Sequence, residues 1–411
     1  MKKIVIISTI FIIFFYNVSL CDDNSYLDDS DNSDNYLLYE TSEVSTSSNE
    51  PNTYSKNIIV IDRKTLRILY EKDAYSKVAM ASTTKIMTCI IALEKCSLLD
   101  TVIISKKSAT VTGSTLGLKE NSKISFNDLL YGLMLRSGND CAIAIAEHIS
   151  GTVENYIDLM NNKALELGLK NTHFVSPHGL DDDEHYTTAY DLAILTDYAL
   201  KNDTFKKIVS TKNYNITLNG FTKNIINTNE LLNNVDGVYG VKTGFTFNAG
   251  RCLVTSCKRN NMDIIIVVLG ANTKKIRGLD TLNLINYIYT NFKYIDISKT
   301  IDESFLEFNK KYLKRIILKK TSDFPIIKLE KKYNYLIPLK TNGNLKLLSK
   351  IYMPNILSPK SPANKAIGTL YIYNNNDLLC NINIYLDKKL SPNSWQFYYK
   401  KIFHFFKEWC L

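Results

Sequence analysis

Residues 80–99 read MASTTKIMTCIIALEKCSLL, and this stretch decides how the first part of the chain folds. Apolar residues such as Ile86 and Ile90 recur at the spacing of one helix face, so the stretch predicts a helix packed into a core. Ser82 and Lys85 lie three residues apart at its start, which places the hydroxyl and the amine on one face. A neutral amine there can accept the hydroxyl proton, so the pair is a candidate activated nucleophile. The alternative is an N-cap serine followed by an exposed lysine.

Strand patterns flank a helical middle section on both sides. Two apolar strands joined by a short turn come before it, and the period changes from helical to strand-like after residue 236. The expected strands are 57–62, 66–70, 238–242, 252–257 and 262–269, and the expected helices are 82–99, 126–135, 142–149, 153–168, 188–201 and 279–292. Strands at both ends of a helical insertion predict one α/β unit whose sheet is assembled from distant parts of the sequence.

A second polar motif, Ser137-Gly138-Asn139, interrupts two apolar helical stretches. A turn between helices leaves polar side chains free to point into a cleft, which makes this motif a candidate part of a site. The same Ser-x-Asn spacing recurs within residues 22–56, for example at 30–32 and at 33–35, so the pattern alone is weak. The alternative is a capping turn.

A third motif, Lys242-Thr243-Gly244, ends a strand pattern and is followed by Phe245. At a strand edge the Lys and Thr side chains can reach a substrate carboxylate, and glycine lets a substrate backbone approach closely. The alternative is a turn at an edge strand. Each motif is weak by itself, but all of them in this order, each in the secondary structure that its chemistry requires, are far more specific.

In this order the motifs resemble the signature of the serine penicillin-recognising enzymes, which is S-x-x-K, S-x-N and K-T-G. The surrounding sequence is similar to secreted low-molecular-weight penicillin-binding proteins of the D-alanyl-D-alanine carboxypeptidase family. The runs that carry this similarity are MASTTKIMT, GLMLRSGNDCAIAIAEHI, LGLKNTHFVSPHGLD, YTTAYDLA and GVKTGFTFNAGRCLV. The resemblance is strong over residues 55–295, and it implies a β-lactamase/transpeptidase-like sheet with a helical insertion, followed by a small β-rich C-terminal domain.

The resemblance implies a role for each motif residue in the reaction. Ser82 would be the acylated nucleophile, and Lys85 would be the base that activates it. Ser137 would relay a proton to the leaving D-alanine amine, and Asn139 would extend the hydrogen-bond network. The backbone N–H groups of Ser82 and Phe245 would form the oxyanion hole. As a base, Lys85 must be neutral near pH 7, which requires burial or a neighbouring positive charge to lower its pKa from about 10.4.

The family also implies substrate-binding residues. Lys242, Thr243 and Gly244 would lie along the substrate side of the strand, and Arg277 would help to hold the terminal carboxylate. A class A β-lactamase would need a glutamate to activate the deacylating water, and residues 171–183 contain no Glu-x-x-Leu-Asn. We therefore expect slow release of β-lactams and hence inhibition by them.

These features predict a serine-type D-Ala-D-Ala carboxypeptidase that removes the terminal D-alanine from peptidoglycan pentapeptides through a Ser82 acyl-enzyme. Its partners would be peptidoglycan stem peptides as substrates and β-lactams as inhibitors, with no cofactor. Two alternatives stay open. One is DD-endopeptidase or transpeptidase activity, because an amine can resolve the same acyl-enzyme in place of water. The other is a non-catalytic wall-binding homologue.

The N-terminal residues predict the compartment. Lys2 and Lys3 precede an uncharged apolar run that ends before Asp22, so residues 1–21 are typical of a secretory signal peptide. The alternative is a retained N-terminal anchor. Either places the remainder outside the cytoplasm, so we expect no nucleic-acid partner although the net charge is +9. Residues 22–56 carry nine acids against one lysine, which predicts an acidic disordered linker.

The C-terminal quarter is basic, since residues 298–411 contain 20 Lys or Arg against 8 Asp or Glu. Short Lys-rich strands with Pro and Asn-Gly turns predict a small β domain over 298–390, separate from a catalytic domain at 57–295. Residues 394–411 have one apolar and one polar helix face, so we expect an amphipathic helix that lies on the outer face of the membrane. The alternative is a terminal helix packed on the β domain.

The chain contains eight cysteines and five histidines. Most cysteines lie in apolar runs and are expected to be small core residues, and Cys252 and Cys257 lack the neighbouring histidine that a zinc site needs. His178 and His185 flank an acidic loop, which we expect them to tether. The scattered positions of these residues predict no metal site.

Overall fold

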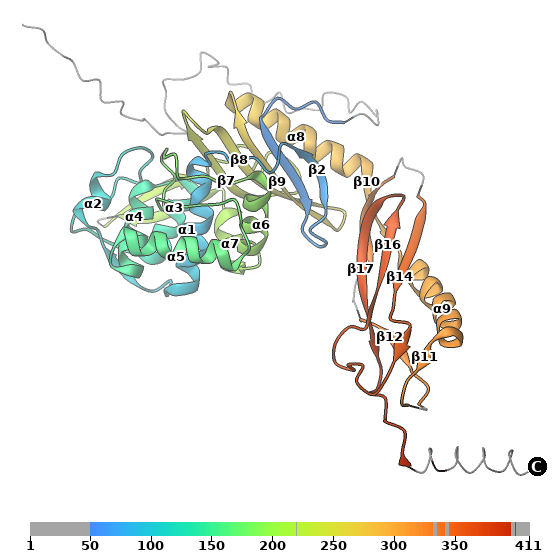
Figure 1. Cartoon of the computed structure of the whole chain (residues 1–411). Coiled ribbons are helices and arrows are strands. Elements are labelled where there is room, and N and C mark those ends of the chain that lie inside the picture. The colour runs from blue at the N-terminus through green and yellow to red at the C-terminus, as the bar shows by residue number, and fades with distance from the viewer. Residues whose placement is uncertain are drawn as a thin grey trace, which may run out of the picture. The chain divides into compact units, whose positions relative to one another are not determined.

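The computed structural model describes residues 50–218, 220–321, 323–331, 335–341, 345–395 and 399. The chain divides into two compact units, Met1–Thr290 and Asn291–Leu411, which are described separately (Figure 1). The expected signal peptide at 1–21 and most of the expected helix at 394–411 lie outside the described residues. No helix within the described ranges is long and apolar enough to cross a membrane.

An antiparallel five-stranded sheet, in the order β2-β1-β9-β8-β7, forms the frame of the first unit. Its strands are β1 (Asn57–Asp62), β2 (Ile68–Lys72), β7 (Val238–Thr246), β8 (Gly250–Arg259) and β9 (Met262–Ala271). Val60 of β1 pairs with Ile266 of β9, so the first strand joins one from far along the chain. The predicted α/β unit, with a sheet assembled from distant parts of the sequence, is confirmed.

The chain between β2 and β7 forms a helical region against one face of this sheet. Side chains alternate across a strand, so Ile59 of β1 and Val267 of β9 enter the core that the sheet shares with the helices. Helix α8 (Lys274–Asn291) runs along the opposite face (Figure 1). The elements of the helical region are η2 (Ala81–Thr84), α1 (Lys85–Lys95), α2 (Lys106–Thr110), α3 (Phe126–Leu135), α4 (Asn139–Ser150), α5 (Val153–Glu166), α6 (Ala189–Ala199) and α7 (Asp203–Val209), with the hairpins β3 (Thr101–Ile103) to β4 (Lys123–Ser125) and β5 (Asn213–Leu218) to β6 (Phe221–Ile226).

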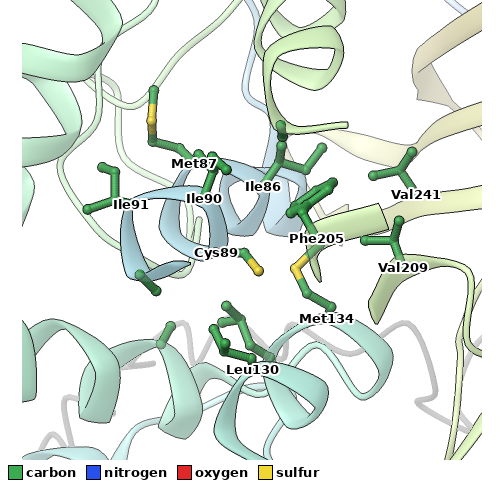
Figure 2. Close-up of a cluster of buried hydrophobic side chains, with 14 of the residues drawn as sticks. Ile86, Met87, Cys89, Ile90, Ile91, Leu130, Met134, Phe205, Val209 and Val241 are labelled. Carbon is green, nitrogen blue, oxygen red and sulfur yellow. The ribbon is translucent and has the colours of Figure 1, made fainter. Parts of the chain in front are cut away.

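Helix α1 lies at the centre of this core (Figure 2). Its residues 85–92 are all buried, and side chains from α3, α7 and β7 surround it. Figure 2 labels Ile86, Met87, Cys89, Ile90 and Ile91 of α1, Leu130 and Met134 of α3, Phe205 and Val209 of α7, and Val241 of β7. Truncating a buried side chain of this size typically costs about 2–5 kcal/mol, so this packing fixes the start of α1 beside β7.

Residues 53–56 belong to the fold, although we expected a disordered linker as far as residue 56. Ser55 is buried, and its N–H and hydroxyl donate to Asp280 Oδ2 at 2.7 and 2.5 Å. The Tyr54 N–H donates to the same oxygen at 3.0 Å. A buried carboxylate needs such donors, so Asp280 of α8 anchors the segment that leads into β1. The linker prediction is wrong for these residues because they satisfy that carboxylate.

Antiparallel strands make up most of the second unit, which confirms the β-rich C-terminal domain. This unit contains a four-stranded sheet in the order β12-β17-β16-β14. It also contains two two-stranded sheets, β10-β13 and β11-β15. The bounds are β10 (Phe292–Asp296), β11 (Ile317–Leu318), β12 (Ile327–Leu329), β13 (Leu336–Lys340), β14 (Leu347–Tyr352), β15 (Ile356–Leu357), β16 (Gly368–Asn374) and β17 (Asp377–Leu386). Because β10 pairs with β13, this unit begins before residue 298.

Helix α9 (Ser298–Arg315) corrects the prediction that the chain after residue 298 forms only short strands. Ile301 and Tyr312 of this helix are buried in the core of the second unit. On its exposed side Lys311 pairs with Glu307 one turn away, an arrangement that supports a helix. The many lysines of this segment made the helical spacing of its apolar residues hard to recognise in the sequence.

Candidate active site

The predicted nucleophile Ser82 and base Lys85 lie on one turn where η2 leads into α1. Lys85 Nζ is 2.8 Å from Ser82 Oγ, and both side chains are buried. Nζ is also 2.8 Å from Asn139 Oδ1 and 2.7 Å from the carbonyl oxygen of His178. The alternative of an N-cap serine with an exposed lysine is wrong, because Thr84 is the N-cap of α1 and Lys85 is fully buried.

Ser137 lies in the turn between α3 and α4, and its hydroxyl meets the third motif. Lys242 Nζ donates to Ser137 Oγ at 2.9 Å. Ser137 has a φ of 61°, a left-handed conformation that costs energy for residues other than glycine and is concentrated at functional sites. The Asn139 amide donates to the Thr112 carbonyl at 2.7 Å, which leaves its oxygen facing Lys85. The motifs from three distant parts of the sequence therefore meet.

Asp140, which the motifs did not single out, holds the loop that precedes this turn. Its buried carboxylate accepts hydrogen bonds from the backbone N–H groups of Leu116, Gly117 and Leu118 at 2.9, 2.9 and 3.0 Å. Such donors stabilise a buried anion and fix the loop. An aspartate beside the Ser-x-Asn motif was the one sequence signal that could have indicated this support.

Gly244 brings β7 against the turn that carries the nucleophile. A Cβ added at Gly244 would lie 3.1 Å from the Ser82 nitrogen and 3.2 Å from the Ala81 Cβ, which is tighter than ordinary contact. We expected this glycine to make room for a substrate backbone, and the structure shows that it makes room for the backbone at Ser82. One residue earlier, the Thr243 hydroxyl forms a hydrogen bond of 2.7 Å with the Thr228 hydroxyl.

Arg277 lies on α8, one strand away from the third motif. Its guanidinium is buried and donates to both carboxylate oxygens of Glu230 at 2.9 and 2.8 Å. It also donates to the carbonyl of Cys252 at 3.4 Å, and Cys252 is the β8 partner of Gly244. Glu230, which no motif indicated, therefore orients the predicted carboxylate-binding arginine in a bidentate pair.

His185 ties the acidic loop to the nucleophile turn, which confirms the expected tethering role. Its Nδ1 accepts from the Val175 N–H at 3.0 Å, so Nε2 carries the proton and donates to Thr84 Oγ1 at 2.7 Å. Burial lowers the pKa of His185 to about 4. Burial lowers the pKa of His178 to about 3. Both imidazoles are therefore neutral at pH 7.

A cavity of about 570 Å³ opens near the end of β7. Asp181 at its edge accepts a hydrogen bond from the Thr246 hydroxyl, two residues beyond Gly244. The lining carries both signs of charge and consists of Lys56, Asn57, Lys77, Val78, Ala79, Asp181, Asp182, Asp183, His185, Tyr186, Asn248, Ala249 and Gly270. This polar hollow therefore lies beyond the end of β7, with Asn248 and Ala249 in its lining.

The assembled groups suit acyl transfer. A buried hydroxyl faces an amine whose other neighbours are fixed carbonyl oxygens, and a second Lys–Ser pair lies beside it. Backbone N–H groups at Ser82 lie next to β7, where they can stabilise a developing oxyanion. Such a constellation can deprotonate a serine and supply a proton to a leaving group.

The sheet, its helical insertion and the Ser–Lys pair define the transpeptidase fold of the serine penicillin-recognising enzymes. Penicillin binding protein 5 from Haemophilus influenzae has a similar structure, with a TM-score of 0.70 and 26% identity over 84% of this chain and 99% of that chain. The Streptomyces K15 DD-transpeptidase gives a TM-score of 0.56 and 33% identity over 58% of this chain and 98% of that chain.

The chain belongs to the D-alanyl-D-alanine carboxypeptidase family, peptidase S11, which residues 44–273 match. D-alanyl-D-alanine carboxypeptidase DacF of Bacillus subtilis (strain 168) is 38% identical over 245 residues, which is 58% of this chain and 63% of DacF. DacC of Escherichia coli (strain K12) is 36% identical over 259 residues, which is 60% of this chain and 64% of DacC. The match thus spans somewhat less than two thirds of the length of these relatives.

Proposed function

We propose that this protein is a serine-type D-Ala-D-Ala carboxypeptidase that removes the terminal D-alanine from peptidoglycan pentapeptides. The observation that carries the proposal is the buried 2.8 Å contact between Lys85 Nζ and Ser82 Oγ. The second Lys–Ser contact, between Lys242 and Ser137, supports it because it supplies a proton route next to the first. Membership in the D-alanyl-D-alanine carboxypeptidase family supports the choice of substrate.

Acylation begins when Ser82 Oγ attacks the carbonyl carbon between the two D-alanines and its proton moves to Lys85 Nζ. Nζ donates to Asn139 Oδ1, to the His178 carbonyl and to Ser82 Oγ. A neutral amine has two N–H donors and one lone pair, so once Nζ has lost one proton the first two acceptors can keep its N–H groups while the lone pair turns to the Ser82 hydroxyl. A general base must be neutral before it takes the proton, and Lys85 is fully buried beside the hydroxyl that it would deprotonate.

Collapse of the tetrahedral intermediate breaks the C–N bond and releases D-alanine. The leaving amine takes its proton through the Ser137 hydroxyl, which Lys242 holds in place. The backbone N–H groups of Ser82 and Phe245 stabilise the oxyanion, and the close approach of Gly244 keeps the two groups together.

The terminal carboxylate of the substrate lies against Lys242, Thr243 and Arg277. Glu230 holds the Arg277 guanidinium in a fixed orientation. The substrate carboxylate is then the second carboxylate that interacts with this guanidinium. Water then attacks the Ser82 ester through the same Ser–Lys pair, and β-lactams inhibit the enzyme because they leave a slowly hydrolysed ester on Ser82.

The enzyme acts outside the cytoplasm. Residues 1–21 form its signal peptide, and residues 394–411 form a helix that lies on the outer face of the cytoplasmic membrane. The basic second unit supports this location, because its described lysines and arginines are all exposed and can face anionic lipid or wall polymer. Deleting residues 394–411 should release the protein from the membrane fraction. Retention of the truncated protein would argue against this helix as the anchor.

Release of D-alanine from a synthetic pentapeptide tests the proposed activity. The wild type should release it, and Ser82→Ala should not, while both keep the same melting temperature. A cross-linked muropeptide dimer tests the alternative, since cleaved dimers without released D-alanine would identify a DD-endopeptidase. A folded wild type that acts on neither but pellets with peptidoglycan would favour the non-catalytic wall-binding homologue.

A further inference from the structure

Cys96, Asp100 and His148 form a cluster at the end of the helical region away from Ser82. Cys96 is the C-cap of α1, Asp100 follows four residues later, and His148 lies in the last turn of α4. The Cys96 Sγ, one Asp100 carboxylate oxygen and one His148 ring nitrogen all lie within 4.8 Å of one another. The positions are scattered in the sequence, which is why the sequence predicted no metal site.

The distance between two of these groups fits shared coordination better than a hydrogen bond. His148 Nε2 is 3.6 Å from Asp100 Oδ2, which is too long for an N–H···O bond. Two ligands bound at roughly 2.0–2.1 Å to one tetrahedral zinc ion lie roughly 3.3 Å apart. A small side-chain movement would therefore place both atoms, with the thiolate, around one ion.

The backbone holds the cluster in a fixed place. The Cys96 N–H donates to the Ala92 carbonyl at 3.1 Å, and the Asp100 carbonyl accepts from the Phe126 N–H at 2.8 Å. The His148 ring packs on the Phe126 ring, with centroids 5.7 Å apart. A metal site whose ligands are already positioned loses less conformational entropy on binding.

The nearby carboxylates of the same helices are engaged elsewhere. Glu94 binds Lys163 and the Tyr198 hydroxyl, and Glu147 accepts from the Ser105 hydroxyl. Asp100 is thus the carboxylate that faces Cys96 and His148. Its side chain is 41% exposed and that of His148 is 27% exposed, so an ion and a water molecule can reach the cluster.

We propose that Cys96, Asp100 and His148 bind one zinc ion, with water in the fourth position. A thiolate, a carboxylate and a neutral imidazole are ligands that zinc prefers, and the two anions balance its charge. The thiol releases its proton on binding. The ion joins the C-terminal ends of α1 and α4, whose N-terminal ends carry Lys85 and Asn139, and so stabilises the helix pair that frames the active site.

Cobalt(II) titration of the full-length protein tests the site, because tetrahedral cobalt bound to a thiolate gives a charge-transfer band in the near ultraviolet. We expect the band to saturate at one equivalent and to disappear when zinc is added. Cys96→Ser should remove the band, and His148→Gln and Asp100→Asn should each weaken zinc binding by about tenfold or more. Cys380→Ser is the matched control, since Cys380 is also partly exposed and should leave the band unchanged.

Thermal unfolding supplies a second readout. Zinc at a hundredfold excess over its Kd should raise the melting temperature of the wild type by about 5 °C and leave that of Cys96→Ser unchanged. His148→Gln keeps the thiol and, with zinc binding weakened about tenfold or more, should show about half of the wild-type shift or less. Absence of the band at stoichiometric cobalt, or a band and shift that persist in both variants, would overturn the proposal.

Discussion

The two units of the chain differ in whether they bury basic side chains. In the first unit Lys85, Lys242, Arg251 and Arg277 are buried, and the structure gives each a specific neighbour. In the described part of the second unit every Lys and Arg is exposed to solvent. Both units are rich in basic residues, so composition does not distinguish them.

Burial of a cation costs several kcal/mol unless fixed acceptors compensate for lost hydration. Around these four residues, the first unit meets this cost with carbonyl, hydroxyl, aromatic and carboxylate neighbours. The guanidinium of Arg251, for example, lies 3.7 Å from the centroid of the Phe245 ring. The buried cations near the motifs thus each have fixed neighbours, whereas exposed cations contribute to the surface field.

Replacing Lys85, the proposed base, should give the largest effect. Lys85→Met keeps the length of the side chain but removes the amine that faces Ser82, so acylation by a fluorescent penicillin should slow by on the order of 10³-fold or more. Lys360→Met in the second unit is the control, since Lys360 is exposed and should label at the wild-type rate. Equal labelling rates in the two variants would contradict the proposed functional difference between buried and exposed cations.

Replacing either residue of the second pair, Lys242 or Ser137, should lower activity by a smaller factor, which should be similar for both residues. Lys242→Met and Ser137→Ala should each lower kcat/KM for the pentapeptide by on the order of 10²-fold, because both remove the same 2.9 Å contact. The double variant should be little worse than either single variant. Losses that multiply in the double variant would show that the two residues act independently.

Gly244→Ala tests whether β7 must touch the nucleophile turn. The added Cβ would lie 3.1 Å from the Ser82 nitrogen, so the acylation rate should fall about tenfold as the strand shifts. Gly220→Ala is the control, because a Cβ there meets open space although its φ is 81°. It should lower the free energy of unfolding by about 1 kcal/mol and leave acylation unchanged. Loss of acylation in the control alone would contradict the assignment.

The smallest effect concerns pH. The folded-state pKa of His185 is lowered to about 4 from an ordinary value of 6.5, so the unfolded chain binds a proton first as the pH falls. Stability from this group is complete above pH 6.5 and decreases, by about 1.4 kcal/mol per pH unit, as the pH drops toward 4. Urea unfolding across this range should show a shallower slope for His185→Gln than for the wild type. The same slope in His185→Gln and in the wild type would contradict this assignment.

Local patterns predicted much of the frame. The apolar runs at 57–62 and 262–269 indicated strands of one sheet on either side of a helical insertion, and the structure shows that these two strands pair. The helix at Ser298–Arg315 was not predicted, because lysines and other polar residues separate its apolar residues, although the pair Lys311 and Glu307, four residues apart, was a helical signal. Residues 53–56 were assigned to the linker because their anchor, Asp280, lies more than two hundred residues away.

The motif residues of the site were predictable, but their supports were not. Ser82, Lys85, Ser137, Asn139 and Lys242 carry recognisable spacings. The carbonyl of His178 that contacts Lys85 leaves no trace in the sequence, since every residue has a carbonyl. Side chains such as Glu230 and Asp140 gain their roles only through tertiary contacts with segments far along the chain. Motifs thus indicate reacting groups, and three-dimensional structure is needed to find what orients them.

Intact-protein mass spectrometry after incubation with benzylpenicillin tests the central claim, that Lys85 makes Ser82 a nucleophile within a buried, compensated site. The account predicts one penicilloyl group per chain, mapped to the peptide that contains Ser82 and absent from Lys85→Met after the same brief exposure. A folded wild type without an adduct, or an adduct on a different serine, would contradict it.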